Sequence, residues 1–169
     1  MEIRRAKYTD IEQIAKIHVE TWQDAYKGLM PAELLDNLSI DQKIKLWESL
    51  LSSDNKDTIV FVATEGESII GFTSIGKSRD PEATEEIGEI YTIYVDHNHY
   101  RKAAGKLLLD AVQVELKELG FSKATLWVLE TNIQGRNFYE KNGWQITEGK
   151  KTEERNGYKL DEVKYKKIL

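Results

Sequence analysis

The chain has 169 residues, of which 40% are hydrophobic and 31% charged, and its formal net charge is −5. These values predict one soluble globular domain over residues 1–169, and the apolar runs are far shorter than the roughly 20 residues of a membrane helix. The lack of cysteine excludes disulfide scaffolds, thiolate metal sites and a cysteine nucleophile, and the negative charge argues against nucleic-acid binding. We therefore expect a cytoplasmic protein that binds neither membranes nor nucleic acid.

Hydrophobic periodicity and turn residues predict the secondary structure. In chain order we expect a strand at Ile3, a helix over 11–25, helices at 32–38 and 40–51, strands at 58–64, 68–75 and 89–95, a helix over 103–119, a strand at 124–129, a helix over 133–142 and two strands around Asn156-Gly157. Thr9 and Glu12 have the spacing of a capping box. A shift of apolar phase in the last strand predicts a bulge near Asp161.

This order of elements predicts an α/β fold with a mixed sheet, written β-α-α-β-β-β-α-β-α-β-β. Two parallel strand–helix–strand crossings lie beside antiparallel hairpins, and the strand ending at Val95 is apolar on both faces. We expect that strand to be central in the sheet.

The segment from Val95 to Lys106 carries the clearest functional signal. A strand runs into a short basic loop that opens directly into a helix, so unpaired backbone N–H groups and the positive end of the helix dipole face one point. Small residues over 103–105 permit a phosphate to approach, and Arg101, Lys102 and Lys106 add positive charge. From local composition alone, an ordinary helix start with surface cations is an equally good interpretation.

Two blocks of sequence resemble the GNAT acetyltransferase superfamily. Tyr100–Gly105 is similar to that family's coenzyme A loop, Gln/Arg-x-x-Gly-x-Gly/Ala, with Tyr100 replacing Gln or Arg and Ala103 replacing the first glycine. Residues 132–144 are similar to Asn-x-x-Ala-x-x-Phe-Tyr-x-x-x-Gly-Phe/Trp, with Gly135 replacing alanine. Backbone recognition survives the exchange at Ala103 if its φ is negative, as at a helix start.

The resemblance implies a GNAT fold whose parallel central strands, 91–95 and 123–129, splay apart around acetyl-CoA. Pantetheine then pairs with Ile93, Tyr94 and Val95. The coenzyme site implied along the loop comprises Tyr100, Arg101, Lys102, Ala103, Ala104, Gly105 and Lys106, with the pyrophosphate on the N–H groups of 101–106. Asn132 is expected near the pantetheine or phosphate arm. Acetyl-CoA is the implied co-substrate, and this chemistry needs no metal.

The reacting end follows from the same resemblance and from the missing cysteine, which favours direct attack of an amine on the thioester. A backbone N–H near Ile93 or Tyr94 is the expected oxyanion donor. Tyr139 matches the family tyrosine that stands beside the sulfur and acts as general acid. Glu89 is the candidate general base, although capping the strand or binding the amine electrostatically explains it equally well.

The acceptor is expected to be a small primary amine. His18, Trp22 and Tyr26 fall on one helical stripe where the family builds its acceptor pocket, although core packing fits them as well. The acidic loop 81–86 favours a polyamine if it folds over the acceptor mouth. A protein or peptide acceptor, and a sensor that binds acyl-CoA without turnover, remain alternatives, and the edge strands of the last hairpin leave a homodimer open.

Overall fold

The computed structural model describes every residue except Arg101 and Asn156. Within that part of the chain the elements are β1 (Glu2–Arg5), the 3-10 turn η1 (Tyr8–Asp10), α1 (Ile11–Ala25), α2 (Ala32–Asp36), α3 (Ile40–Leu50), β2 (Thr58–Glu65), β3 (Ser68–Lys77), β4 (Ile87–Val95), η2 (His97–His99), α4 (Ala104–Glu118), β5 (Lys123–Leu129), α5 (Ile133–Lys141), β6 (Gln145–Arg155) and β7 (Tyr158–Ile168). The predicted α/β order is confirmed, and the helices expected over 11–25, 32–38 and 40–51 all form before β2. The Asn156 half of the predicted hairpin turn lies outside the described residues.

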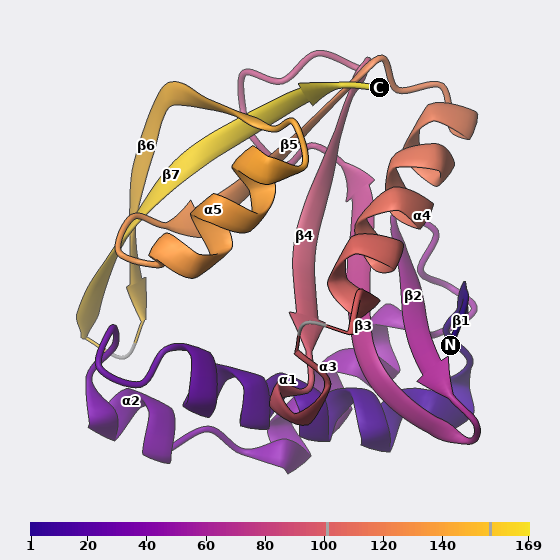
Figure 1. Cartoon of the computed structure of the whole chain (residues 1–169), viewed down its shortest axis with the longest axis vertical. Helices are drawn as coiled ribbons and strands as arrows, with labels where there is room; N and C mark the ends of the chain where they lie inside the picture. The colour runs from indigo at the N-terminus through magenta and orange to yellow at the C-terminus, as the bar shows by residue number, and fades with distance from the viewer. Residues whose placement is uncertain (101, 156) are drawn as a thin grey trace.

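All seven strands form one sheet in the order β1-β2-β3-β4-β5-β7-β6 (Figure 1). Only β4 and β5 pair in parallel among these strands, and β4 is central as predicted. The crossing through α5 places β6 beyond β7, so β6 runs in the direction of β5 without being its neighbour. None of the described helices is long and apolar enough to cross a membrane.

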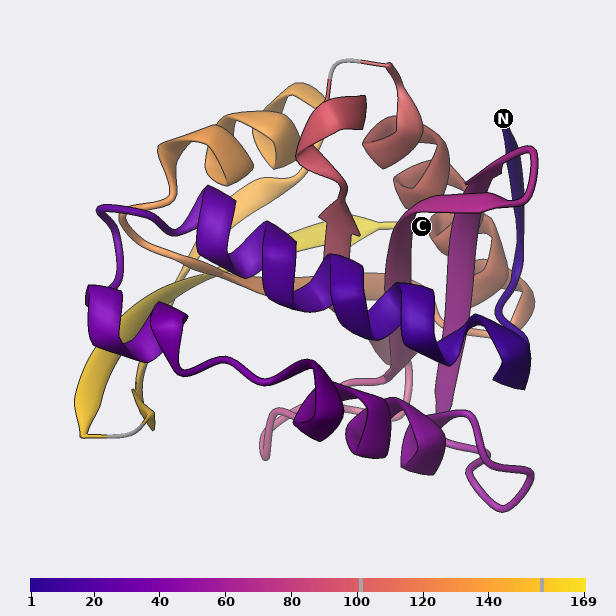
Figure 2. The same cartoon turned by 90° about the horizontal axis from the view of Figure 1, so that it is seen from below.

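Helices cover both faces of the sheet (Figure 1 and Figure 2). On one face α4 buries Leu108, Leu109 and Val112 against the strands, and α5 extends this core through Tyr139. The other face packs against α1, α2 and α3, with Trp47 of α3 only 1% exposed. The sheet therefore lies between two helical layers.

The two covered faces explain the shift of apolar phase in β7. Leu160 packs with α1 and α2, whereas Val163 packs with α4 and α5 on the opposite face. Asp161 pairs regularly with Thr152, and the irregular register falls on β6 between Ile146 and Lys150. The predicted bulge near Asp161 is therefore wrong, because burial on two faces produces the same sequence pattern.

The start of α1 also differs from the prediction. Thr9 lies inside η1, and the helix begins at Ile11 with no side-chain hydrogen bond from its N-cap. Asp10 instead accepts the Lys7 N–H at 2.7 Å and pairs through both oxygens with Arg4 at 2.7 and 3.0 Å. The bidentate ion pair between Arg4 and Asp10 is stronger than a hydrogen bond from a hydroxyl group. The capping box predicted for Thr9 and Glu12 therefore does not form.

Candidate active site

The site begins where β4 and β5 part. The two strands pair from Ile87 with Lys123 to Ile90 with Leu126, and beyond that point β4 pairs with β3 and β5 with β7. A register shift opposite Ser74 adds one residue to β4 at this position. The predicted splaying is confirmed, and it leaves one backbone edge of the last residues of β4 without a strand partner in the described chain.

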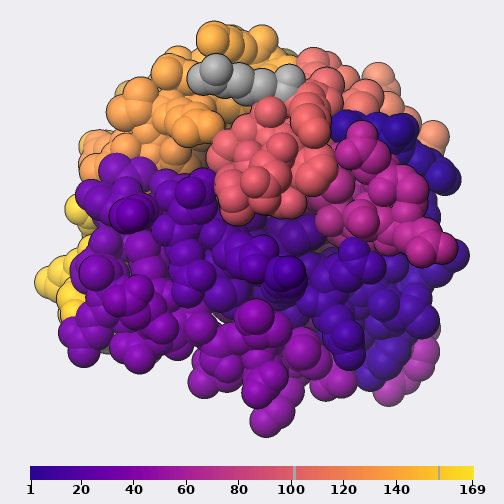
Figure 3. Space-filling view, turned by 60° about the horizontal axis from the view of Figure 1, so that its bottom comes forward, coloured from indigo at the N-terminus to yellow at the C-terminus, as the bar shows by residue number. Residues whose placement is uncertain are grey.

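A cavity of about 700 Å³ occupies this gap. The segments that border it, α1, the loop before α4 and α5, meet on one face of the molecule (Figure 3). Of the residues predicted for the site, those that line the cavity are His18, Trp22, Tyr26, Ile93, Tyr94, Val95, Tyr100, Ala103, Ala104, Gly105, Lys106, Asn132 and Tyr139. Lys102 and Glu89 are not among the lining residues, and Arg101 lies outside the described residues.

The first turn of α4 supplies the anion cradle. The Leu107 N–H bonds to the carbonyl of Ala103 at 3.0 Å, so the amides of 104–106 precede the first hydrogen bond of the helix. Together with the helix dipole they favour a bound phosphate. The Lys102 N–H donates to the carbonyl of His99 at 3.4 Å. The cradle is therefore narrower than the predicted span of 101–106.

Ala103 adopts a backbone conformation that differs from the expectation. Its φ is +66°, in the left-handed region that glycine adopts freely and that costs alanine about 1–2 kcal/mol. The negative φ expected at Ala103 is therefore not found. The turn into α4 keeps the geometry of a glycine position although an alanine occupies it, and the loop carries backbone strain.

Relief of this strain is testable. We expect Ala103→Gly to raise the free energy of unfolding by about 1 kcal/mol, because glycine removes the left-handed penalty of about 1–2 kcal/mol and loses part of that gain to chain entropy. The control is Ala104→Gly one residue later, which enters the helix and should lower stability by about 1 kcal/mol. Urea unfolding measures both. The same sign for both variants would contradict the strain at Ala103.

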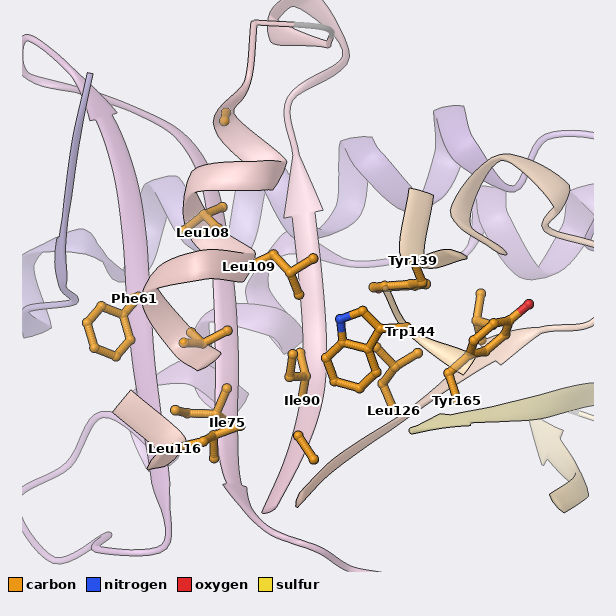
Figure 4. Close-up of a cluster of buried hydrophobic side chains, with 14 of the residues drawn as sticks. Phe61, Ile75, Ile90, Leu108, Leu109, Leu116, Leu126, Tyr139, Trp144 and Tyr165 are labelled. Carbon is orange, nitrogen blue, oxygen red and sulfur yellow. The ribbon is translucent and has the colours of Figure 1, made fainter. Parts of the chain in front are cut away.

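Tyr139 lies on α5 between the core and the cavity. Its ring is 6.2 Å from the rings of Trp144 and Tyr165, measured between centroids (Figure 4). The core interpretation and the site interpretation therefore both hold, since Tyr139 also lines the cavity. Burial raises the pKa of the Tyr139 hydroxyl well above its ordinary value, and nearby Tyr94 adds to this effect. The hydroxyl is thus a hydrogen-bond donor at neutral pH.

Glu89 is placed differently from the prediction. It is 4% exposed, and its carboxylate accepts the Arg79 N–H at 2.8 Å and the Ser78 hydroxyl at 3.3 Å. The Arg79 guanidinium lies 3.6 Å from the same carboxylate and stacks 3.7 Å above the Tyr91 ring. Glu89 therefore anchors the turn after β3, and Arg79, not Glu89, reaches the cavity. This placement argues against the predicted base.

The acidic loop does not cover the acceptor mouth. Glu85 pairs with Lys77, and Glu86 pairs with Lys123 at 3.4 Å, while Glu82 is exposed. None of the three glutamates is among the described residues that line the cavity. Lysines on neighbouring strands hold this loop, so its charge gives no support to a polyamine acceptor.

Four charged lining residues were not predicted: Arg79 after β3, Lys43 of α3, Arg155 of β6 and Glu162 of β7. Glu162 pairs in register with Leu129, the last residue of β5, and lies 3.2 Å from Lys151. Burial raises the pKa of Tyr94 to about 12, and Tyr94 and Glu162 line the same cavity. The sequence contained a signal for Glu162, because this residue lies between Leu160 and Val163, where the apolar residues of β7 change from one face of the sheet to the other.

Known proteins resemble this chain in both sequence and structure. A family model described as the acetyltransferase (GNAT) family matches residues 11–144. The chain is 34% identical to an uncharacterized N-acetyltransferase, YuaI, of Bacillus subtilis over 131 residues, which are 77% of this chain and 72% of that protein. It is 26% identical to the spermidine N(1)-acetyltransferase of Thermoplasma acidophilum over 149 residues, 86% of this chain and 89% of that protein. Among solved structures, the PaiA N-acetyltransferase of Thermoplasma acidophilum in complex with coenzyme A superposes with a TM-score of 0.74 at 25% identity, covering 99% of this chain and 98% of that one.

Proposed function

Because this chain belongs to the GNAT acetyltransferase family and is an N-acetyltransferase, we propose that it transfers the acetyl group of acetyl-CoA directly to a primary amine of a small molecule. The observation that carries the proposal is one continuous cavity. It joins the amides at the start of α4, the open edge of β4, the Tyr139 side chain and an aromatic chamber against α1.

The residues that line the cavity at the start of α4 and along the end of β4 fit a coenzyme. The amides of Ala104, Gly105 and Lys106 bind the pyrophosphate, and the open edge of β4 over 93–95 pairs with pantetheine. Asn132 caps α5, since its side-chain oxygen accepts the Gly135 N–H at 2.9 Å. Its amide NH₂ group is left to face the coenzyme.

The transfer forms a C–N bond and breaks the thioester C–S bond. Glu162 takes one proton from the acceptor ammonium, which makes the amine nucleophilic. A backbone N–H of Ile93 or Tyr94 stabilises the carbonyl oxygen as charge develops on it. Tyr139 donates a hydrogen bond to the leaving sulfur, and the second amine proton ends on the thiol. The products are the acetamide, the free thiol and one proton released to solvent.

Two results support a polyamine as the first acceptor class to test: the names of a spermidine-acetylating relative and of a PaiA neighbour. The experiment follows thiol release from acetyl-CoA with a panel of small amines and peptides, and identifies the products by mass spectrometry. Saturable release with a small amine is the expected result. Tight acetyl-CoA binding without release for any acceptor would indicate a sensor, and faster release with peptides would indicate a protein acceptor.

The base can be assigned by comparing two glutamates. A hydrogen bond to a charged group is worth about 1.5–3 kcal/mol, so Glu162→Gln should lower kcat/KM for the amine about tenfold or more at neutral pH. Raising the pH should recover part of the loss, because solvent then deprotonates the amine. Glu89→Gln, whose amide oxygen still accepts the Arg79 N–H, should cost less. A larger loss of kcat/KM in Glu89→Gln than in Glu162→Gln, recovered at high pH, would identify Glu89 as the base.

A further inference from the structure

The part of the cavity between α1, α3 and the last hairpin is here named the acceptor chamber. It is lined by His18, Trp22, Tyr26, Lys43, Arg155 and Glu162. Hydrogen-bond donors outnumber acceptors in this set, because two of its members are cations and one is a carboxylate. The acceptor that enters must complement this imbalance.

Two cations of the acceptor chamber lie over the ring of Trp22. The Lys43 ammonium lies 5.7 Å and the Arg155 guanidinium 5.0 Å from its ring centroid. The side chain is 7% exposed, and its indole N–H has no hydrogen-bond partner among the described residues. Because the indole nitrogen itself is buried, a ligand in the cavity meets the two cations that lie over the Trp22 ring rather than the indole N–H.

His18 adds another donor. Its Nδ1 accepts the Trp47 indole N–H at 3.2 Å, so the ring carries its proton on Nε2. Burial, with Lys43 and Arg155 contributing, lowers the pKa of His18 to about 3, which keeps the imidazole neutral. His18 therefore offers the chamber an N–H group and is not available as a base.

Pairing within the protein leaves Lys43 without a counter-ion. Arg155 pairs with Glu153 at 2.8 Å, and Glu162 pairs with Lys151 at 3.2 Å. Lys43 has no ion-pair partner in the part of the chain that the structure describes, and burial and Arg155 both lower its pKa. The chamber lacks one negative charge, and a second ammonium entering it would meet Lys43 and Arg155.

Resting on the proposed function, we propose that the acceptor is a small amino carboxylate rather than a simple di- or polyamine. Its carboxylate is bound by the two cations of the chamber, Lys43 and Arg155. Its amine points toward Glu162, which pairs in register with Leu129 of β5 and lines the same cavity as Tyr139. The chamber thus selects for an anionic group at one end of the substrate and an amine at the other.

Matched acceptors that differ by one carboxylate test this inference. We compare lysine with cadaverine and ornithine with putrescine, and include spermidine, by thiol release from acetyl-CoA. The amino acid of each pair should have the higher kcat/KM, by about tenfold or more, since a charge-assisted hydrogen bond is worth about 1.5–3 kcal/mol. Equal rates, or preference for the diamines, would overturn the inference.

Variants locate the effect. Lys43→Gln, and independently Arg155→Gln, should reduce the lysine-to-cadaverine ratio about tenfold, mainly through KM. Lys45→Gln on the same helix is the control, because Lys45 is exposed and does not line the cavity. It should keep the wild-type ratio. A ratio that falls equally in Lys45→Gln would overturn the inference.

A binding measurement separates this inference from the proposed function. Calorimetry follows lysine and cadaverine added to the enzyme with coenzyme A present. Lysine binding that Lys43→Gln weakens, without turnover of acetyl-CoA, would support the carboxylate subsite and contradict the proposed transfer. Turnover without preference for the carboxylate would do the opposite, and neither binding nor turnover would contradict both.

Discussion

Tyr139→Phe is expected to lower kcat for thiol release from acetyl-CoA about 100-fold, because the loss of one positioned hydrogen-bond donor to developing charge costs about 10²–10³ in rate. KM for acetyl-CoA should change by less than about threefold, since the hydroxyl is needed when the C–S bond breaks and not when the coenzyme binds. Phenylalanine keeps the ring between Trp144 and Tyr165, so the fold should persist. Steady-state kinetics with circular dichroism measure both.

The pH dependence gives a second readout for the same residue. Because burial raises the pKa of Tyr139, the phenol stays protonated through the neutral range. The loss in kcat should therefore be the same at pH 7 as at pH 9. Tyr158→Phe is the control, since the Tyr158 hydroxyl donates to Glu33 at 2.9 Å outside the cavity. A kcat for Tyr139→Phe equal to that of this control would show that the hydroxyl takes no part in the reaction.

Acid should destabilise the protein through His18. Its pKa falls from 6.5 to about 3 on folding, mainly because burial disfavours the charged ring. The unfolded chain binds the proton more readily, so stability from the neutral imidazole is complete above about pH 6.5 and is lost as the pH falls toward 3. At 1.36 kcal/mol per pH unit, the wild type should lose about 2–3 kcal/mol between pH 7 and pH 4.5 from this group.

Urea unfolding of His18→Gln tests the assignment. Glutamine can still accept the Trp47 indole N–H but does not titrate, so the variant should lack most of this pH-dependent loss. His97→Gln is the control, because His97 lies on the surface beside Asp96. It should retain the acid sensitivity of the wild type. If His18→Gln and the wild type lose stability in parallel, the acid sensitivity resides elsewhere.

His18 and Trp22 show how one helix serves both the fold and the site. Both are buried on the face of α1 that packs on the sheet, and both line the cavity. Core packing and lining of the cavity are therefore compatible for this aromatic stripe. A cavity that opens from the core must be lined by core residues, and their hydrogen-bonding atoms then determine what it binds.

The sequence alone determined the order of elements and the mixed sheet, and it identified the helix start that we propose for the coenzyme. These depend on local physics: helix periodicity, the free amides of a helix start and a contiguous motif such as Asn132–Trp144. Each acts over a few residues, so it can be read along the chain. The family resemblance rests on the same segments, and the family match confirms it.

Only the tertiary structure decided which charged groups meet in the cavity. Lys43 lies far in sequence from Arg155 and Glu162, and the three line one cavity because β7 inserts between β5 and β6. Glu89 is committed to the turn at Ser78 and Arg79, and the acidic loop is held by lysines of other strands. The charge that a site presents depends on which partners packing brings within a few ångströms of each group, and a local pattern does not contain that information.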